Sequence, residues 1–244
     1  MRLARLLTPE GPIEGRYVDG TVVADDGVYE VGTDGRLLPP CEPSALYCVG
    51  RNYAETLDQM SYERPEEPDF FIKPPTSLLA HGETIPHPDW TEELTYAGEL
   101  VAVIGERCRS LEPAAVPGIL RGYTILNDID ALDQVGRTAR KAFDGSAPLG
   151  PWIETDLDPF DLDMETFVGG ERRQDATTEL MLFDPHEIVA HLSKRFTLRP
   201  GDCIAFGSPA NPGLVEPGET VSITYEGIGT LENRVVEGEF PSTH

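Results

Sequence analysis

Short segments with alternating apolar and polar positions make up most of the chain, separated by glycine, proline and aspartate. A period of two is typical of β-strands that bury one face. Residues 1–35 alternate in this way between tight-turn residues and predict short antiparallel strands. A stretch with three prolines follows and is typical of a linker. We therefore predict a small N-terminal β domain with its linker over residues 1–43 and a main domain over residues 44–244.

The main domain is also predicted to be rich in strands, because its apolar runs are β-branched or aromatic and end at Gly, Pro or Asp. The predicted strands lie in residues 45–53, 69–80, 99–106, 121–130, 148–155, 165–174, 202–209 and 219–237. Helices are predicted at 54–60, 113–122 and 184–196. In the last of these, Asp184 is the expected N-cap and Pro185 the first helical residue. The predicted fold class is mainly β with some α.

The chain is strongly acidic, with 43 Asp and Glu against 19 Lys and Arg and a net charge of −24. Such a surface repels phosphate backbones and anionic lipids, so nucleic acid and membranes are excluded as expected partners. Molar salt shortens the Debye length to about 3 Å and would relieve the self-repulsion. We therefore hypothesise a halophilic protein in a salt-rich cytoplasm; the alternative is an ordinary acidic protein.

Targeting and cysteine signals are weak. The first fifteen residues lack the apolar segment of a signal peptide, and no stretch has the length needed to cross a bilayer. The four cysteines form no CxxC pair, which favours reduced, buried thiols over a zinc site or a disulfide framework. These features predict a cytoplasmic protein.

A carboxylate interrupts the apolar run TYAGELVAVIG (95–105) at Glu99. A second carboxylate, Asp128, ends the apolar run YTIL. A buried carboxylate is costly without a partner, and strand ends beside loops are where sites are commonly assembled. Two oxygen donors, completed by water and a chelating substrate, suit Mg²⁺ or Mn²⁺. The alternative is that both carboxylates pair with Lys, Arg or backbone amides.

Seven motifs occur together in one order: GRNY (50–53), FFIKPPTSL (70–78), YAGELVAVIG (96–105), GYTILNDIDALD (122–133), KAFDGSAPLGP (141–151), FVGGERRQDATTELM (167–181) and LRPGDCIAFGSP (198–209). In this order they resemble the fumarylacetoacetate hydrolase family over nearly all of residues 46–237. The resemblance implies a mixed β-roll preceded by a small N-terminal β domain, assembled as a homodimer. It further implies Mg²⁺ or Mn²⁺ and an enzyme that cleaves, dehydrates, decarboxylates or isomerises small 2-oxo acids and acylpyruvates.

The resemblance also assigns site residues. Its E-x-E metal motif places the second glutamate at Glu99 but the first at Ala97, and its N-D pair gives Asp128 as a metal ligand. The polar catalytic residue implied by KAFD is Lys141. The implied substrate contacts are Tyr53, Lys73 and Ser208.

Other positions depart from the family pattern. The histidine and glutamate that activate water in its hydrolases are replaced by Thr56 and Gln59, which do not titrate near neutral pH. The arginine and serine of the N-D-x-S-A-R-D motif are replaced by Leu132 and Asp130, and Asp130 could supply a replacement metal ligand.

Three hypotheses remain open. The first is a lyase or tautomerase that needs no water-activating pair: Glu99 and Asp128 hold a metal that stabilises an enolate, and Lys141 or another group moves the proton. The second is a hydrolase with a relocated base, such as Glu55 or His81. The third is a catalytically inactive family member that serves as a binding or assembly subunit.

Overall fold

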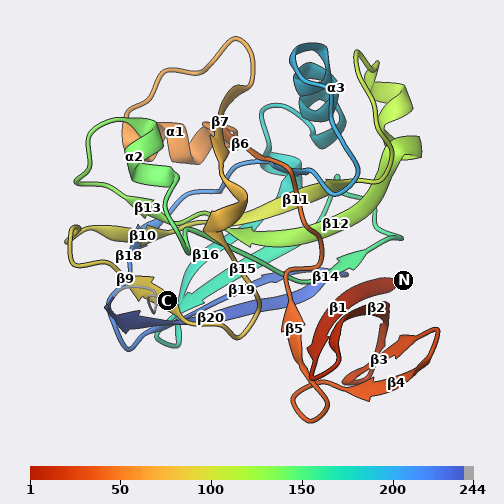
Figure 1. The fold of residues 1–244 in the computed structure, drawn as a ribbon. Helices are drawn as coiled ribbons and strands as arrows, with labels where there is room; N and C mark the ends of the chain where they lie inside the picture. Colours follow the sequence, from red (N-terminus) through yellow and green to blue (C-terminus); the bar gives the residue numbers. More distant parts are fainter. Residues whose placement is uncertain (239–244) are drawn as a thin grey trace.

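The computed structural model describes residues 1–238, and its regular structure is mostly strand. Figure 1 shows the arrangement. The strands are β1 (Arg2–Thr8), β2 (Gly11–Val18), β3 (Thr21–Ala24), β4 (Gly27–Glu30), β5 (Arg36–Leu38), β6 (Leu46–Gly50), β7 (Asp69–Lys73), β8 (Leu78–Leu79), β9 (Ile85–His87), β10 (Leu94–Tyr96), β11 (Gly98–Ile104), β12 (Leu120–Asn127), β13 (Asp130–Ala131), β14 (Ala147–Glu154), β15 (Asp163–Val168), β16 (Glu171–Thr177), β17 (Cys203–Ala205), β18 (Gly213–Leu214), β19 (Thr220–Tyr225) and β20 (Gly229–Glu237). The helices are α1 (Ala54–Met60), α2 (Arg137–Lys141) and α3 (Pro185–Arg195), with short 3₁₀ segments at Pro75–Ser77, Pro113–Ile119 and Thr178–Leu180. The predicted class, mainly β with some α, is confirmed.

The largest sheet has twelve strands and runs through both predicted domains. Its main path is β4-β3-β2-β1-β14-β12-β11-β17-β6-β7, with β5 on β1 and β8 on β14. The N-terminal strands stand at one corner of the molecule but join the main sheet where Arg2 pairs with Glu154. The predicted linker contributes a strand of its own, β5, whose Leu37 is buried.

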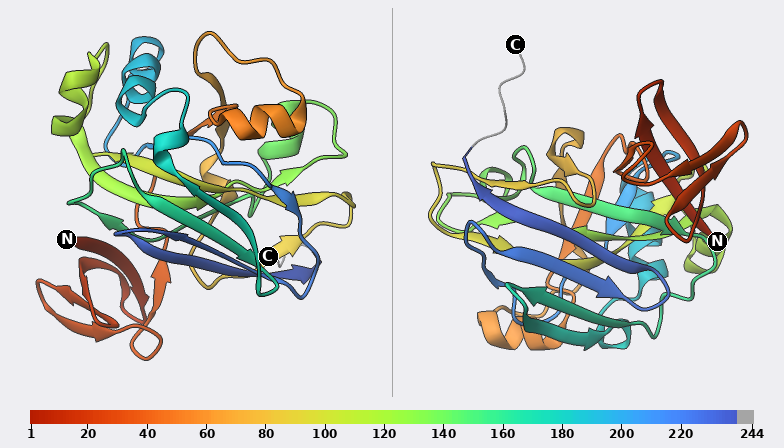
Figure 2. Two further views of the ribbon diagram at one scale, coloured as in Figure 1. Left: turned by 180° about the vertical axis from the view of Figure 1, so that it is seen from behind. Right: turned by 90° about the horizontal axis from the view of Figure 1, so that it is seen from below.

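A five-stranded sheet, β16-β15-β19-β20-β9, lies against the main sheet, as both views of Figure 2 show. The largest hydrophobic core forms between the two sheets and below α3. It includes Leu100 and Ile125 of the main sheet and Ile223 of the smaller one. Gly98 of β11 faces this contact: a Cβ there would come within 2.8 Å of Ile223 and 2.9 Å of Met164.

Side chains on β11 are buried on both faces. Leu100 and Ile104 belong to the core between the sheets, whereas Val101 and Val103 belong to a second core on the opposite face. Because side chains alternate along a strand, Glu99 lies on the same face as Val101. The register of this strand therefore fixes where the carboxylate points.

Two of the predicted helices form as expected. Helix α1 has the predicted bounds, and α3 begins after Asp184, which forms a capping box with Glu187. The segment predicted as a helix at 113–122 is a 3₁₀ helix containing Pro117, because proline removes the backbone donor that an α-helix needs. Helix α2 was not predicted from the sequence.

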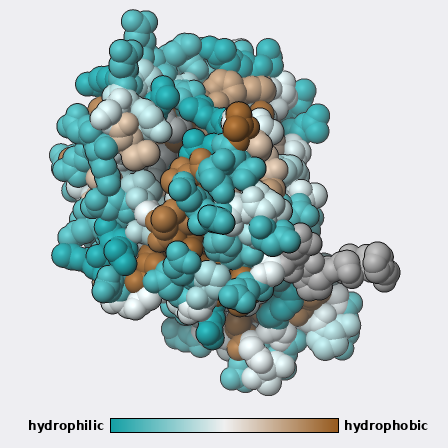
Figure 3. Space-filling view, turned by 90° about the vertical axis from the view of Figure 1, so that its left-hand side faces the viewer, coloured by the Kyte–Doolittle hydropathy of each residue, from teal (hydrophilic) through white to brown (hydrophobic). Residues whose placement is uncertain are grey.

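The surface near α2, β13 and β18 faces the viewer in Figure 3 and is largely hydrophilic, with separate apolar patches. Exposed apolar residues of this region include Val135 and Leu214. Across residues 1–238, none of the helices has both the length and the apolar character that a membrane span requires. The four cysteines are buried and free, as predicted.

Candidate active site

Four strands of the main sheet bring the candidate residues to one edge. Strand β11 begins where β12 ends, because Gly98 pairs with Asn127 in antiparallel register. Glu99 and Asp128 are therefore neighbours at this edge, and the Asp128 N–H donates to the Ala97 carbonyl at 2.8 Å. The end of β17 lies beside the start of β11, and β6 runs parallel to β17. The loops after these strands, which carry Arg51 and Ser208, meet at the same place.

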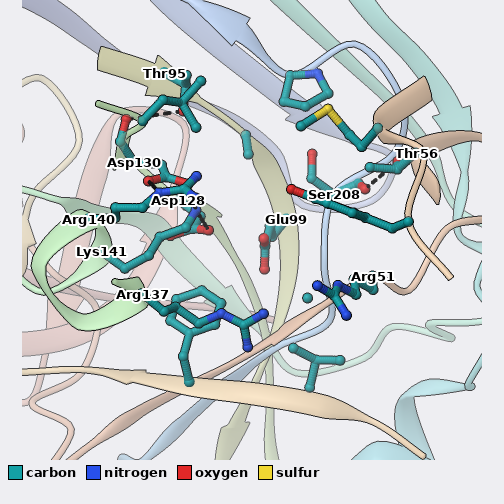
Figure 4. A pocket seen from close by; sticks show the side chains of 18 of the residues that line it. Arg51, Thr56, Thr95, Glu99, Asp128, Asp130, Arg137, Arg140, Lys141 and Ser208 are labelled. Carbon is teal, nitrogen blue, oxygen red and sulfur yellow. Dashed lines mark hydrogen bonds and ion pairs between the residues drawn. The ribbon is translucent and has the colours of Figure 1, made fainter. Parts of the chain in front are cut away.

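These strand ends enclose a cavity of about 400 Å³. Glu99 points into its centre, and Asp128, Asp130 and Lys141 form one wall (Figure 4). Ser208 lies on the opposite side of Glu99. Five residues that the sequence indicated therefore line the cavity: Glu99, Asp128, Asp130, Lys141 and Ser208.

Asp128 is neutralised by two ammonium groups. It is 3% exposed, and Lys73 Nζ lies 2.9 Å from Oδ1 while Lys141 Nζ contacts Oδ2. Burial alone would raise the pKa of Asp128, but the positive charges of Lys141 and Lys73 and the hydrogen bond from Lys141 outweigh burial and lower the pKa. Asp128 is therefore ionised at neutral pH.

Glu99 is as deeply buried, at 3% exposed, but has much weaker support. Its Oε2 accepts one hydrogen bond, from the Gly207 N–H at 3.1 Å, and it forms no ion pair within residues 1–238. Gly207 can present this N–H because it has φ +89° and because a Cβ would come within 2.9 Å of the Val49 carbonyl oxygen. Burial and the nearby Asp128 charge raise the pKa of Glu99 to about 8.

The third carboxylate, Asp130, is paired as well. Arg140 of α2 binds it with two nitrogens, at 2.9 and 2.6 Å, and Lys141 Nζ lies 3.2 Å away. Lys141 thus lies between Asp128 and Asp130. Burial alone would lower the pKa of Lys141, but these two carboxylates outweigh burial and raise it. In this arrangement Lys141 carries a proton and suits the role of an acid or a fixed cation rather than a base.

Lys73 does not lie where a substrate contact is expected. Its side chain is fully buried outside the cavity lining, and its Nζ donates to the carbonyls of Ile129 (2.9 Å), Lys141 (2.6 Å) and Ser146 (2.8 Å). All three ammonium hydrogens are thereby used. Its geometry corrects the prediction that it contacts the substrate: Lys73 orients Asp128 from behind.

Tyr53 is likewise buried, at 1% exposed, and does not line the cavity. Its phenol lies beside Tyr225, and burial raises its pKa. The substrate contact expected from Tyr53 stays a prediction, and the position of Tyr53 outside the cavity lining does not support it. Ser208, in contrast, lines the cavity, and its Oγ accepts from Gln174 Nε2 at 2.9 Å, which leaves the hydroxyl hydrogen available.

Thr56 and Gln59 stand where the family's hydrolases have the histidine and glutamate that activate water, and both form other hydrogen bonds. Thr56 lines the cavity and donates to the Ser208 carbonyl at 3.0 Å, while Gln59 accepts from the Asn211 N–H at 2.8 Å. Neither alternative base reaches the cavity: Glu55 is exposed on α1, and His81 accepts from the Glu232 N–H at 3.1 Å. The hypothesis of a base relocated to either residue therefore has no geometric support.

The cavity also contains three arginines that sequence reasoning missed. They are Arg51 after β6 and Arg137 and Arg140 on α2. Arg51 stands in the GRNY motif, but the motif did not indicate that its side chain would line the cavity. The α2 segment has no apolar period that would have predicted a helix.

A divalent cation needs several oxygen ligands that converge on one point. Within residues 1–238, no group of three or more His, Cys, Asp or Glu side chains is placed to hold a metal ion, and Asp130 is taken by Arg140. Glu99 nevertheless has no cation partner among residues 1–238, since its one hydrogen bond comes from the Gly207 N–H, and Asp128 lies nearby. Mg²⁺ binds through one or two carboxylates together with water and substrate oxygens, so this pair fits such an ion.

A strand-rich α+β fold with a charged cavity at its strand ends is the architecture that the sequence motifs implied. Residues 45–236 match the family model described as fumarylacetoacetate (FAA) hydrolase C-terminal. The chain belongs to the fumarylacetoacetate hydrolase family, and its predicted membership is confirmed.

Within this family, the chain is similar to an isomerase, to an isomerase/decarboxylase and to a hydrolase. A crystal structure of 5-carboxymethyl-2-hydroxymuconate delta-isomerase from Mycobacterium smegmatis is 39% identical, with a TM-score of 0.89 over 98% of this chain and 100% of that one. The 4-hydroxyphenylacetate degradation bifunctional isomerase/decarboxylase of Salmonella dublin is 36% identical over 81% of this chain and 48% of its own length. A maleylpyruvate hydrolase from Sphingobium, in complex with manganese(II) ion and pyruvate, is 26% identical, with a TM-score of 0.84 over 98% of this chain and 100% of that one.

Proposed function

We propose that this protein is a divalent-metal-dependent enzyme that acts on a small 2-oxo acid or acylpyruvate through an enolate. The observation that carries the proposal is the buried Glu99 carboxylate, which has one hydrogen bond and no ion pair in residues 1–238 and faces a cavity beside Asp128. The similarity to an isomerase, to an isomerase/decarboxylase and to a hydrolase crystallised with manganese and pyruvate supports it.

Glu99 and Asp128 would hold Mg²⁺ or Mn²⁺. The ion would withdraw electron density from the 2-oxo group and so favour the enolate form. Ser208 has a hydroxyl hydrogen free to bind the substrate carboxylate. Lys141, protonated between Asp128 and Asp130, would deliver a proton to the enolate and be recharged from solvent at the cavity mouth.

Among the reactions of this family, tautomerisation and decarboxylation suit the cavity better than hydrolysis. Both move a proton or lose CO₂ without an attacking water. Thr56 and Gln59 have no titrating group near neutral pH, so the chain lacks a base where the family's hydrolases activate water.

The test is a turnover screen of the manganese-loaded protein with oxaloacetate, acylpyruvates and the enol forms of 2-oxo acids. We expect decarboxylation or ketonisation, and we expect Lys141→Met to lower kcat by about 10²–10⁴ because general acid catalysis contributes that much. Lys194→Met, on the exposed face of α3, is the control and should retain activity. Unchanged kcat in Lys141→Met would remove Lys141 from the mechanism. No turnover of any substrate would favour the alternative of an inactive binding or assembly subunit.

A further inference from the structure

Two buried cysteine side chains contact each other away from the candidate active site. Cys41 stands in the segment between β5 and β6, and Cys203 is the first residue of β17. They are 162 positions apart in the sequence, yet their Sγ atoms lie 3.4 Å apart. Their exposed fractions are 3% and 1%, and both belong to the second core, which also contains Val101 and Val103. Neither thiol has a part in the chemistry described above.

Hydrogen bonds hold the segment that carries Cys41 on both sides. After it, Asp202 Oδ1 accepts from the Ser44 N–H at 2.9 Å and from the Ser44 hydroxyl at 2.6 Å. Before it, Arg5 of β1 donates to the Pro39 carbonyl at 3.2 Å. Asp202 is itself buried and directly precedes Cys203 in the chain. The same contacts that fix this segment therefore hold the two thiols together.

Only one of the two thiols faces an open space. Cys41 lines a surface cavity of about 540 Å³, together with residues that include Arg5, Arg121 and Gly201, whereas Cys203 does not line it. A peroxide molecule is far smaller than this cavity. The hydrogen bond with Cys41 and burial raise the pKa of the Cys203 thiol well above its usual value. Cys41 is therefore the sulfur that an oxidant meets first, and Cys203 is the sulfur that closes the bond.

We propose that Cys41 and Cys203 form a reversible redox site at which hydrogen peroxide closes a disulfide bond. First, the Cys41 sulfur attacks one peroxide oxygen: the O–O bond breaks, Cys41 becomes a sulfenic acid, and the other oxygen leaves with the thiol proton as water. Second, the Cys203 sulfur attacks the sulfenic sulfur: the S–S bond forms, the S–O bond breaks, and the hydroxyl leaves with the Cys203 proton as water. Two thiols and one peroxide thus give one disulfide and two waters, and a dithiol reductant reverses the change.

The bond would tie the N-terminal domain to the middle of the main sheet. Cys41 follows β5, which pairs with β1, whereas Cys203 opens β17, which lies between β11 and β6. Closing so long a loop removes conformational entropy from the unfolded chain and so stabilises the folded one. The proposed function does not enter this argument, because the sulfurs lie at the opposite end of β17 from Gly207 and Ser208.

The experiment treats the folded chain with hydrogen peroxide, removes the peroxide with catalase, and alkylates the remaining thiols in urea. We expect mass spectrometry to find two alkylated thiols in place of four, and a peptide pair joined through Cys41 and Cys203 that dithiothreitol separates. The thermal unfolding midpoint should rise by at least about 5 °C on oxidation and return on reduction.

Cys41→Ala and Cys203→Ala should form no disulfide and show no such rise. The matched control is Cys108→Ala. Cys108 is the most exposed of the four cysteines, at 8%, and lies in the other core, so exposure alone would favour its oxidation. The Cys108→Ala variant should form the disulfide as the wild type does.

Four alkylated thiols after the treatment, a disulfide that maps to Cys48 or Cys108, or a loss of thiols that dithiothreitol does not reverse would each overturn the proposal. The peptide mapping uses the wild type, so it decides the matter even where an alanine variant does not fold. A disulfide between Cys41 and Cys203 with an unchanged thermal midpoint would support the redox site and refute its stabilising effect.

Discussion

Two carboxylates at the same sheet edge, equally buried, have opposite electrostatic environments. Asp128 and Glu99 are each 3% exposed. Asp128 contacts two ammonium groups and its pKa is lowered, whereas Glu99 accepts one backbone hydrogen bond and its pKa is raised to about 8. Burial is common to both, so the partners decide the difference. The negative charge of Asp128 is already neutralised by Lys73 and Lys141. Glu99 has no such partner in residues 1–238, so its carboxylate is the one that can take a further cation.

Removing the ammonium behind Asp128 should have the largest effect on stability. Lys73→Met would leave a buried carboxylate with one cation and three carbonyls without their donor. Breaking a buried ion pair in this way costs about 3–5 kcal/mol, so we expect the free energy of unfolding in urea to fall by that amount. Lys194→Met, at an exposed position, should change it by less than about 0.5 kcal/mol. A Lys73→Met variant as stable as the wild type would mean that Asp128 is not held as described.

Neutralising Glu99 should raise the free energy of unfolding at high pH, whereas removing the Lys73 ammonium should lower it. Because the pKa of Glu99 is raised in the folded state, stability from its protonation is present below the unfolded pKa of about 4.3 and is lost as pH rises through about 8. Metal-free Glu99→Gln should therefore be more stable than the wild type by up to about 5 kcal/mol at pH 9 and about equal to it near pH 4.

Urea unfolding of both proteins at several pH values measures this difference. Glu226→Gln, at an exposed position, is the matched control and should track the wild type throughout. A difference that does not grow between pH 5 and pH 8 would contradict the raised pKa of Glu99.

Salt should change the contribution of the surface charges to the free energy of unfolding, but not that of the buried ion pairs. We expect this effect to be smaller than those of the two substitutions above. If the net charge of −24 makes the protein halophilic, its free energy of unfolding should rise by about 1 kcal/mol or more from low to molar salt. The deficit of Lys73→Met should stay constant over the same series, because buried pairs are screened much less. Wild-type stability that does not change with salt would refute the halophile hypothesis.

Sequence patterns predicted the elements that carry clear periodicity and the residues that stand at strand ends. The apolar run of β11 and the capped helix α3 were predicted because local sequence determines them. Glu99 and Asp128 come together because the antiparallel register joins the start of one strand to the end of the next. Sequence spacing indicated both residues without giving that register.

Motifs were less informative about where side chains point. Lys73 matches the family pattern, but three carbonyls from distant segments draw its ammonium behind the cavity. Arg51 lines the cavity because β6 pairs with β7, a long-range contact that a local motif does not encode. Arg137 does so through α2, a five-residue helix without an apolar stripe. Tertiary pairing, rather than residue type, separates the residues that line the cavity from those that support it.

The central claim is that Glu99 is a ligand of the proposed divalent cation. Its most direct test is calorimetric titration of Mn²⁺ into chelator-stripped wild type and Glu99→Gln at pH 9, with and without oxalate as a mimic of the enolised 2-oxo acid. The account predicts binding to the wild type that oxalate strengthens, and at least a hundredfold weaker binding to Glu99→Gln. Equal Mn²⁺ affinity in the two proteins, or none in either with oxalate present, would contradict it.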